Sequence, residues 1–167
     1  MGENRIRKAN MQDLEQMLAI YEHARAYMRE SGNPNQWGGT YPPEELLVQD
    51  INTGISYVLE DEQGNVHGTF VFFEGEDPTY RIIEGGNWLN DDRYGVIHRV
   101  ASDGQLKGVV ASCVGYCFAI CGNLRMDTHR DNLTMQHALE KQGFRRCGIV
   151  YLANGSERIA YQKSTGD

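Results

Sequence analysis

Long hydrophobic runs are missing from this sequence, and no apolar stretch approaches the ~20 residues that a membrane-spanning helix requires. The segment Met1–Asn10 is polar and lacks the apolar core of a secretory signal peptide. Internal repeats and low-complexity tracts are absent as well. We therefore expect a cytoplasmic protein with no membrane partner. Its 167 residues suit one hydrophobic core, so we expect residues 1–167 to form a single domain.

Positive charge is scarce: 16 Lys and Arg residues stand against 23 Asp and Glu residues, which gives a net charge of -7. A protein that binds nucleic acid without sequence preference usually carries a basic patch, and none stands out here. We therefore expect no nucleic-acid partner. The acidic balance favours a cationic or amine-bearing partner, while a helix N-terminus with free backbone N–H groups could still hold a phosphate locally.

The four cysteines are the only residues that suggest a metal, and three of them, Cys113, Cys117 and Cys121, recur every four residues. This spacing could bring three thiolates to successive turns of one helix, so a metal or redox protein is one interpretation. Zinc sites, however, usually draw on CxxC pairs with further ligands elsewhere. We favour small buried side chains on one helix face and expect no metal.

Hydrophobic periodicity divides the chain into strands and helices. It predicts helices after the capping residue Asn10, over Glu44–Asn52, from Gly108, and from Asp131 or Asn132. Strands are predicted at Asn4–Ala9, Ile55–Glu60, Val66–Glu74, Tyr94–Ala101, Leu124–Thr128, Arg145–Leu152 and Glu157–Lys163. The order β-α-α-β-β-β-α-β-α-β-β indicates an α/β fold with a mixed sheet.

Two connections are predicted in more detail. The long segment from Gly75 to Arg93 could hold a further short strand at Tyr80–Ile83. Between the last two strands, Asn154-Gly155 predicts a two-residue hairpin turn.

The clearest candidate for a binding site is the connection after the strand that ends at Ala101. A glycine-containing turn follows, and a helix opens at Gly108, which brings free N–H donors and the positive end of a helix dipole to one point. Such a point suits a pyrophosphate. Gly104 and Gly108 let the backbone approach closely, and Gln105 and Lys107 add side-chain donors. Turns of this kind are common and mostly structural, so on this ground alone both interpretations stay open.

Two motifs resemble the acetyl-CoA-binding segments of the GNAT superfamily of N-acetyltransferases. Gln105-Leu106-Lys107-Gly108-Val109-Val110 is similar to the family's Q/R-x-x-G-x-G/A loop, which also follows a strand. Asn132, with Lys141-x-Gly143-Phe144 beyond it, is similar to the second cofactor segment. The segments 98–102 and 127–132 resemble an uncharacterised bacterial subgroup of the family. The resemblance covers Arg5–Lys163.

The resemblance implies a mixed, mostly antiparallel GNAT-like sheet with helices on both faces and a splayed β-α-β crossover that binds the cofactor. It also implies an acyltransferase, which passes acetyl from the cosubstrate acetyl-CoA directly to a primary amine of a small molecule or a peptide. Backbone N–H groups of residues 105 to 110 would hold the pyrophosphate. The cofactor-binding residues implied in this way are Val100, Ala101, Gln105, Leu106, Lys107, Gly108, Val109, Val110 and Asn132.

Two positions depart from the family pattern. Val110 stands where the family prefers Gly or Ala, and Leu139 stands where many members place a Tyr that protonates the departing thiolate. Both departures favour an alternative, namely a catalytically weak CoA-binding regulatory module. The sequence leaves the acyl acceptor open, and its edge strands with an aromatic C-terminal hairpin would permit a homodimer.

Amine acetylation needs a group that takes a proton from the amine. Asp127, placed where some family members carry a catalytic Glu, is the first candidate, with a structural or substrate-binding carboxylate as the equal alternative. His98 is the second, because imidazole titrates near neutrality, although a hydrogen-bonded sheet histidine is the more common case. Of the aromatic residues that could shape the acceptor pocket, we select Trp37 and Tyr94 over Tyr41 and Trp88, with plain packing as the alternative.

Overall fold

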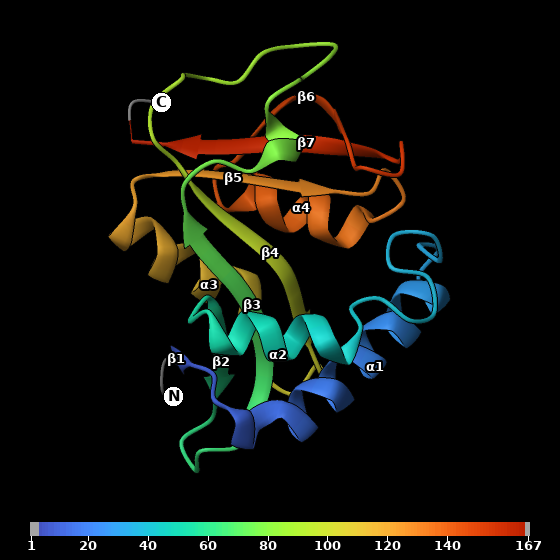
Figure 1. Ribbon diagram of the computed structural model, residues 1–167, viewed down its shortest axis with the longest axis vertical. Helices are drawn as coiled ribbons and strands as arrows, with labels where there is room; N and C mark the ends of the chain where they lie inside the picture. Colours follow the sequence, from blue (N-terminus) through green and yellow to red (C-terminus); the bar gives the residue numbers. More distant parts are fainter. Residues whose placement is uncertain (1–3, 166–167) are drawn as a thin grey trace.

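The computed structural model describes residues 4–165, and within them seven strands form one sheet in the order β1-β2-β3-β4-β5-β7-β6 (Figure 1). Each neighbouring pair is antiparallel except β4 with β5, which is parallel. The mixed, mostly antiparallel sheet that the sequence predicts is therefore confirmed. The strands are β1 (Arg5–Lys8), β2 (Ser56–Glu60), β3 (Val66–Glu74), β4 (Gly95–Ser102), β5 (Asn123–Thr128), β6 (Arg145–Tyr151) and β7 (Glu157–Ser164).

Helices cover both faces of the sheet, as expected. The four α-helices are α1 (Leu14–Glu30), α2 (Glu44–Asn52), α3 (Val109–Ile120) and α4 (Leu133–Lys141). Apolar side chains of α1 and α2 pack with Val58 and Ala101 on one face. Those of α3 and α4 pack with Phe70 and Leu124 on the other. None of the helices within residues 4–165 is long and apolar enough to cross a membrane.

Capping residues fix the starts of two helices where the sequence places them. Asn10 forms a capping box with Asp13 around a short 3₁₀ turn, Met11–Asp13, that leads into α1. Asn132 caps α4, because its side-chain oxygen accepts a hydrogen bond from the backbone N–H of Met135 at 2.9 Å. The first backbone N–H groups of a helix have no partner within the helix, and a capping side chain accepts a hydrogen bond from one of them. These caps therefore set the helix boundaries.

The sheet opens between its two parallel strands. β4 and β5 pair only at Gly95 with Leu124 and at Val96 with Arg125, and beyond that point they diverge. In Figure 1, β5 and β7 accordingly run across the view while β3 and β4 run steeply. The splayed crossover implied by the resemblance is confirmed. It leaves the second half of β4 without a partner strand on that side.

β4 also carries a bulge just beyond the opening. The register pairs His98 with Val71 and Ala101 with Thr69, so that Arg99 and Val100 together oppose one residue of β3. Arg99 adopts a φ of 52°, which is uncommon for a residue with a side chain. The hydroxyl of Tyr21, from α1, donates to the carbonyl oxygen of Arg99 at 2.9 Å and holds the bulge in place. Bulges of this kind re-aim side chains next to functional sites.

Two local predictions need correction. Residues Tyr80–Ile83 form no strand. A 3₁₀ helix, η2 (Pro78–Tyr80), ends at Tyr80 instead, with Asp77 as its cap and Pro78 at its first position. The hairpin between β6 and β7 is closed by Leu152 and Ser156, with the N–H of Gly155 donating to the carbonyl of Leu152 at 2.8 Å. Three residues, 153–155, therefore lie between this closing pair rather than the two predicted.

Candidate active site

A groove of about 230 Å³ lies between α1 and α4, with the end of β4 as its floor and the first turn of α3 at one end. The open sheet makes this groove possible, since no strand covers β4 on that side. Its lining residues include His23, Tyr27 and Met28 from α1, and Thr134, Met135 and Ala138 from α4.

The turn between β4 and α3 is fixed to β3 by a hydrogen bond of His67. His67 Nδ1 lies 2.8 Å from Asp103 Oδ2, and Asp103 Oδ1 accepts from the backbone N–H of Gln105 at 3.0 Å. The N–H of Gly104 donates to the Ser102 hydroxyl at 3.0 Å. The hydrogen bond with Asp103, followed by that with Asp61, raises the pKa of His67. Hydrogen bonds of Ser102, Asp103 and His67 therefore fix the conformation of the turn without a ligand.

Free donors gather where the turn enters α3. Within the described chain, the backbone N–H groups of residues 106 to 110 have no hydrogen-bond partner. Gly108, with a φ of 65°, directs the backbone into the helix, and no atom lies within 4 Å of a Cβ built on it. Free N–H groups at the positive end of a helix dipole form an anion-binding point. Of the N–H groups of residues 105 to 110 expected to hold a pyrophosphate, those of 106 to 110 are therefore free, whereas that of Gln105 is engaged by Asp103.

The nine residues predicted to bind the cofactor divide into two groups. Val100, Ala101, Val109, Val110 and Asn132 line the groove. The other four form the adjoining turn and are Gln105, Leu106, Lys107 and Gly108.

Two of these side chains are already engaged. The Gln105 amide bends back toward Asp103, with its nitrogen 3.4 Å from the carboxylate. The Asn132 amide caps α4 and also donates to Gln36 Oε1 at 2.9 Å. Each amide can still form further hydrogen bonds.

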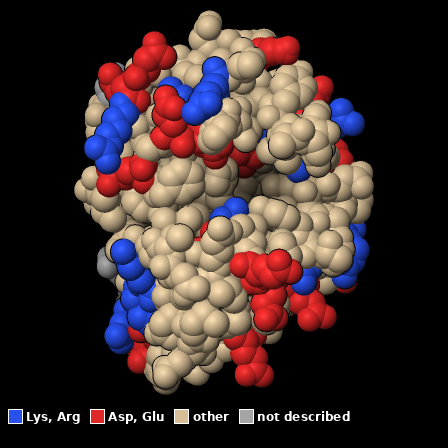
Figure 2. All heavy atoms as spheres, in the orientation of Figure 1, with Lys and Arg blue, Asp and Glu red and all other residues tan. Residues whose placement is uncertain are grey.

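A second, larger cavity of about 530 Å³ continues from the groove into the opening between β4 and β5. Figure 2 shows a hollow near the centre of this face of the molecule, with acidic and basic side chains at its rim. The groove and the cavity share four lining residues, namely Met28, Val100, Asn132 and Met135. A ligand in the groove would therefore reach the cavity with one end.

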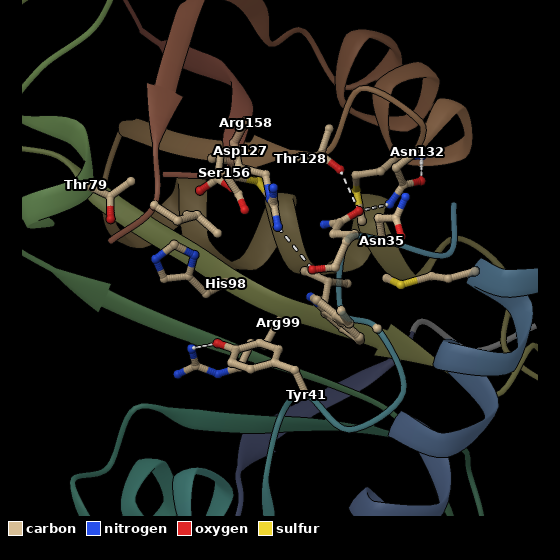
Figure 3. Close-up of a pocket in the computed structure, with 18 of the residues that line it drawn as sticks. Asn35, Tyr41, Thr79, His98, Arg99, Asp127, Thr128, Asn132, Ser156 and Arg158 are labelled. Atoms are coloured by element: carbon tan, nitrogen blue, oxygen red, sulfur yellow. Dashed lines mark hydrogen bonds between the residues drawn. The ribbon is translucent and has the colours of Figure 1, made fainter. Parts of the chain in front are cut away.

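His98 and Asp127 both line this cavity, so the structure brings the two predicted catalytic residues together. Each lies two residues beyond the last parallel pair, Val96 with Arg125, and so they occupy equivalent positions on the same face. In Figure 3, His98 approaches from β4 and Asp127 from β5.

The imidazole of His98 is backed by a carboxylate that the sequence analysis missed. His98 Nε2 lies 2.6 Å from Asp77 Oδ2, and only a quarter of the His98 side chain is exposed. Burial, which alone would raise the pKa of Asp77, is outweighed by the hydrogen bond with His98, so that the pKa lies below its ordinary value. Asp77 is therefore an anion that orients the ring and would stabilise its protonated form.

Asp127 has a different partner. The hydroxyl of Tyr80, the last residue of η2, donates to Asp127 Oδ2 at 2.6 Å. Tyr80 is fully buried, and burial raises its pKa well above the ordinary value, so it acts as a neutral donor. One oxygen of Asp127 is fixed in this way, and Oδ1 remains available for a donor in the cavity.

Two arginines, neither of them predicted, complete the polar lining. Arg99 forms an ion pair with Asp50 at 2.7 Å and donates to the Tyr41 hydroxyl at 3.2 Å. Arg158 donates to two backbone carbonyls, those of Glu157 at 2.8 Å and of Gln36 at 3.0 Å. The 33–41 segment is thereby held over the cavity.

The aromatic predictions have mixed outcomes. Trp37 lines the cavity, together with Tyr41. Tyr94, expected to bind the acceptor, does not line the cavity. The residue is buried, its hydroxyl accepts from the N–H of Asp77 at 3.0 Å, and its ring lies against Arg125. Tyr94 packs beneath the site, because it immediately precedes β4 and so lies ahead of the opening between β4 and β5. Trp88 packs there as well.

The cysteines and Leu139 belong to the core. Cys113, Cys117 and Cys121 are buried as predicted, and burial raises the pKa of Cys113 and Cys117. Within residues 4–165, no group of three or more His, Cys, Asp or Glu side chains is arranged to hold a metal ion. Leu139 is fully buried among the apolar residues between α4 and the sheet, and it does not line either cavity.

A scan of the sequence against models of known protein families finds no match, and a search of curated proteins finds none either. Solved structures are more informative. An acetyltransferase of the GNAT family from Streptococcus agalactiae is 31% identical, with 97% of this chain and 95% of that chain covered and a TM-score of 0.88. The chain belongs to the GNAT family.

Two more distant structures share the GNAT fold with the chain. An acetyltransferase of the family from Listeria monocytogenes is 20% identical over 96% of this chain and 94% of that chain, with a TM-score of 0.70. A GNAT phosphinothricin acetyltransferase from Sinorhizobium meliloti, solved in complex with AcCoA, is 16% identical over 98% of this chain and 91% of that chain, with a TM-score of 0.63. The family is thus one of acetyltransferases, and at least one member of this fold binds AcCoA.

Proposed function

We propose that this GNAT protein is an acetyl-CoA-dependent N-acetyltransferase that transfers acetyl directly to a primary amine. The observation that carries the proposal is the junction of two cavities: a groove with free N–H donors meets, at Val100 and Asn132, a cavity lined by His98 and Asp127. The groove suits acetyl-CoA, and the cavity suits the amine.

The groove's own groups would bind the cosubstrate. The N–H groups of residues 106 to 110 suit the pyrophosphate, and the unpaired edge of β4 at Val100 and Ala101 offers backbone groups to the amide bonds of the pantetheine. Acetyl-CoA would supply an activated thioester, which the four shared residues would place at the cavity.

His98 is the better placed of the two candidate bases, which reverses the order that the sequence favours. Asp77 holds its ring at 2.6 Å and would stabilise the imidazolium, whereas Asp127 is engaged by Tyr80 and suits holding an incoming ammonium. As the amine nitrogen bonds to the acetyl carbon, His98 would take the proton that the nitrogen loses, and the carbon–sulfur electron pair would leave with sulfur. Because Leu139 cannot donate a proton, we assign protonation of the sulfur to solvent or to His98.

A panel of primary amines tests the proposal, with free thiol release and the mass of the acetylated product as readouts. We expect turnover of at least one amine that depends on acetyl-CoA. Binding of acetyl-CoA without turnover of any amine would instead favour the regulatory module, which the absence of a Tyr at position 139 already suggests.

A further inference from the structure

Arg125 and Arg158 are buried around the site and Arg99 is largely buried, and the protein compensates the charge of only two of these three arginines. Arg99 forms its ion pair with Asp50 at 2.7 Å. The guanidinium of Arg125 lies between two aromatic rings, 4.1 Å from the centre of Trp88 and 4.0 Å from that of Tyr94. Arg158, which is 6% exposed, has neither kind of partner.

Arg158 makes its two hydrogen bonds to neutral carbonyl oxygens, and within residues 4–165 it forms no ion pair. A guanidinium has five N–H donors, so three remain unused. Figure 3 shows the side chain entering the cavity from β7. Burial lowers the pKa of Arg158, with the nearby Asp127 acting in the opposite direction. A buried cation with no carboxylate partner is costly, and a bound anion would remove that cost.

An acidic group stands close to Arg158 on the same face of the sheet. Asp127 pairs with Ala160 across β5 and β7, so Arg158 is its diagonal neighbour, at about 7–8 Å between Cα atoms. The two side chains form no ion pair, yet both line the cavity. The cavity therefore contains one carboxylate, Asp127, and one guanidinium, Arg158, that form no ion pair and that a single small molecule could contact together.

We propose that the acyl acceptor is an amine that also carries a carboxylate, an amino acid or a close analogue, with its carboxylate on Arg158 and its ammonium beside Asp127 and His98. This inference rests on the proposed function and narrows the acceptor class. A bidentate carboxylate would use two of the free donors of Arg158. A polyamine has no anionic group for Arg158 and would place positive charge beside a buried cation.

The test compares each of the common amino acids with its carboxamide, which keeps the amine and replaces only the carboxylate. We expect kcat/KM with the preferred amino acid to exceed that with its carboxamide at least ~10-fold. Arg158→Gln should lower kcat/KM for the acid about 10²-fold, chiefly through KM, and change the carboxamide less than ~3-fold, since a charge-assisted hydrogen bond is lost only with the acid. Arg158→Lys should restore part of the preference. Arg146→Gln, outside the cavity, is the matched control and should leave the preference unchanged.

The outcomes separate the two claims. Transfer to amines without preference for a carboxylate, or equal losses for acid and carboxamide in Arg158→Gln, would overturn the inference and leave the proposed function standing. If no amine is acetylated, the proposed function fails, and binding decides the inference. Amino acids should then raise the melting temperature of the wild-type protein but not of Arg158→Gln, and the absence of any such difference would overturn it.

Discussion

The groove and the cavity meet in one site but are built in different ways. Apart from its α1 wall, the groove is formed by one stretch of chain, in which β4, the turn, α3 and α4 follow each other with only β5 between them. The cavity draws on more separate regions: α1, the 33–41 segment, the η2 segment, the open ends of β4 and β5, the start of α4, and the β6–β7 hairpin with the first residues of β7.

This difference explains what each part can do. A local unit of strand, turn and helix presents backbone donors, which do not depend on side-chain identity and so suit a cosubstrate common to a family. A cavity assembled from distant segments presents side chains such as Asp77 and Arg158, which can differ between relatives and so suit selection of the acceptor. Changes in the cavity should therefore affect turnover and acceptor choice, and changes in the turn should affect acetyl-CoA affinity.

The largest effect is expected from the His98–Asp77 pair. His98→Gln removes the proposed proton acceptor, and turnover should fall about 10²–10⁴-fold while acetyl-CoA affinity stays within a few-fold. Asp77→Asn should give a smaller loss and shift the pH profile of kcat, because the ring loses its anionic partner. His129→Gln is the matched control, since His129 lies after β5 but does not line the cavity. Normal turnover by His98→Gln in steady-state kinetics would refute the assignment.

Asp127→Asn tests whether Asp127 binds the ammonium while His98 takes the proton. The amide keeps the shape but not the charge that would hold the ammonium, so we expect kcat/KM to fall about 10–10²-fold, mainly through KM, as for loss of a charged hydrogen bond. If kcat falls instead, as far as in His98→Gln, Asp127 is the base and the order favoured by the sequence is right.

Gly108 tests the turn. Ala at a φ of 65° is strained by about 1–2 kcal/mol, and relief of that strain would rotate the N–H groups away from the pyrophosphate. Calorimetry should show acetyl-CoA binding weakened roughly tenfold. Gly64→Ala, at a φ of 86° in the β2–β3 hairpin, carries a similar strain and should leave affinity unchanged. Equal acetyl-CoA affinities for the two variants would show that the turn at Gly108 does not bind the cosubstrate.

The contribution of His67, which holds the turn through Asp103, to the free energy of unfolding should depend on pH. The pKa of His67 is raised in the folded protein, so its stabilising contribution is complete below the unfolded value of about 6.5 and is lost as pH rises through the folded value. The stability gap between wild type and His67→Gln should therefore be wider near pH 6 than near pH 9, as measured by urea unfolding. His137→Gln, on the exposed side of α4, should show no such dependence. A gap that widens with pH would contradict this account.

The smallest functional effect is expected from the cysteines. Replacing Cys113, Cys117 and Cys121 together by Ala should lower stability by about 1 kcal/mol per site, because each substitution leaves a small void in the core. Acetyl-CoA affinity should remain nearly intact. Stoichiometric zinc or iron in the purified wild-type protein, measured by elemental analysis, would contradict the structural role.

The sequence predicts the residues of the groove more completely than those of the cavity, for a physical reason: it selects His98, Asp127 and Trp37 but neither Asp77 nor Arg158. The turn, Gly108 and the Asn132 cap are set by local rules of strand, turn and helix, so their positions follow from nearby residues. Asp77 meets His98 across 21 positions, and Arg158 meets Gln36 across 122, and no local rule connects such residues. Asp77-Pro78 does carry a recognisable helix-start signal, which would have placed η2 but not its partner.

The most direct test of the central claim is a crystal structure of the protein with acetyl-CoA. We expect the pyrophosphate on the N–H groups of residues 106 to 110, the pantetheine along Val100 and Ala101, and the thioester at the junction of groove and cavity. Density for acetyl-CoA elsewhere, or with its thioester directed away from His98, would contradict the account. So would an empty groove after soaking at millimolar acetyl-CoA.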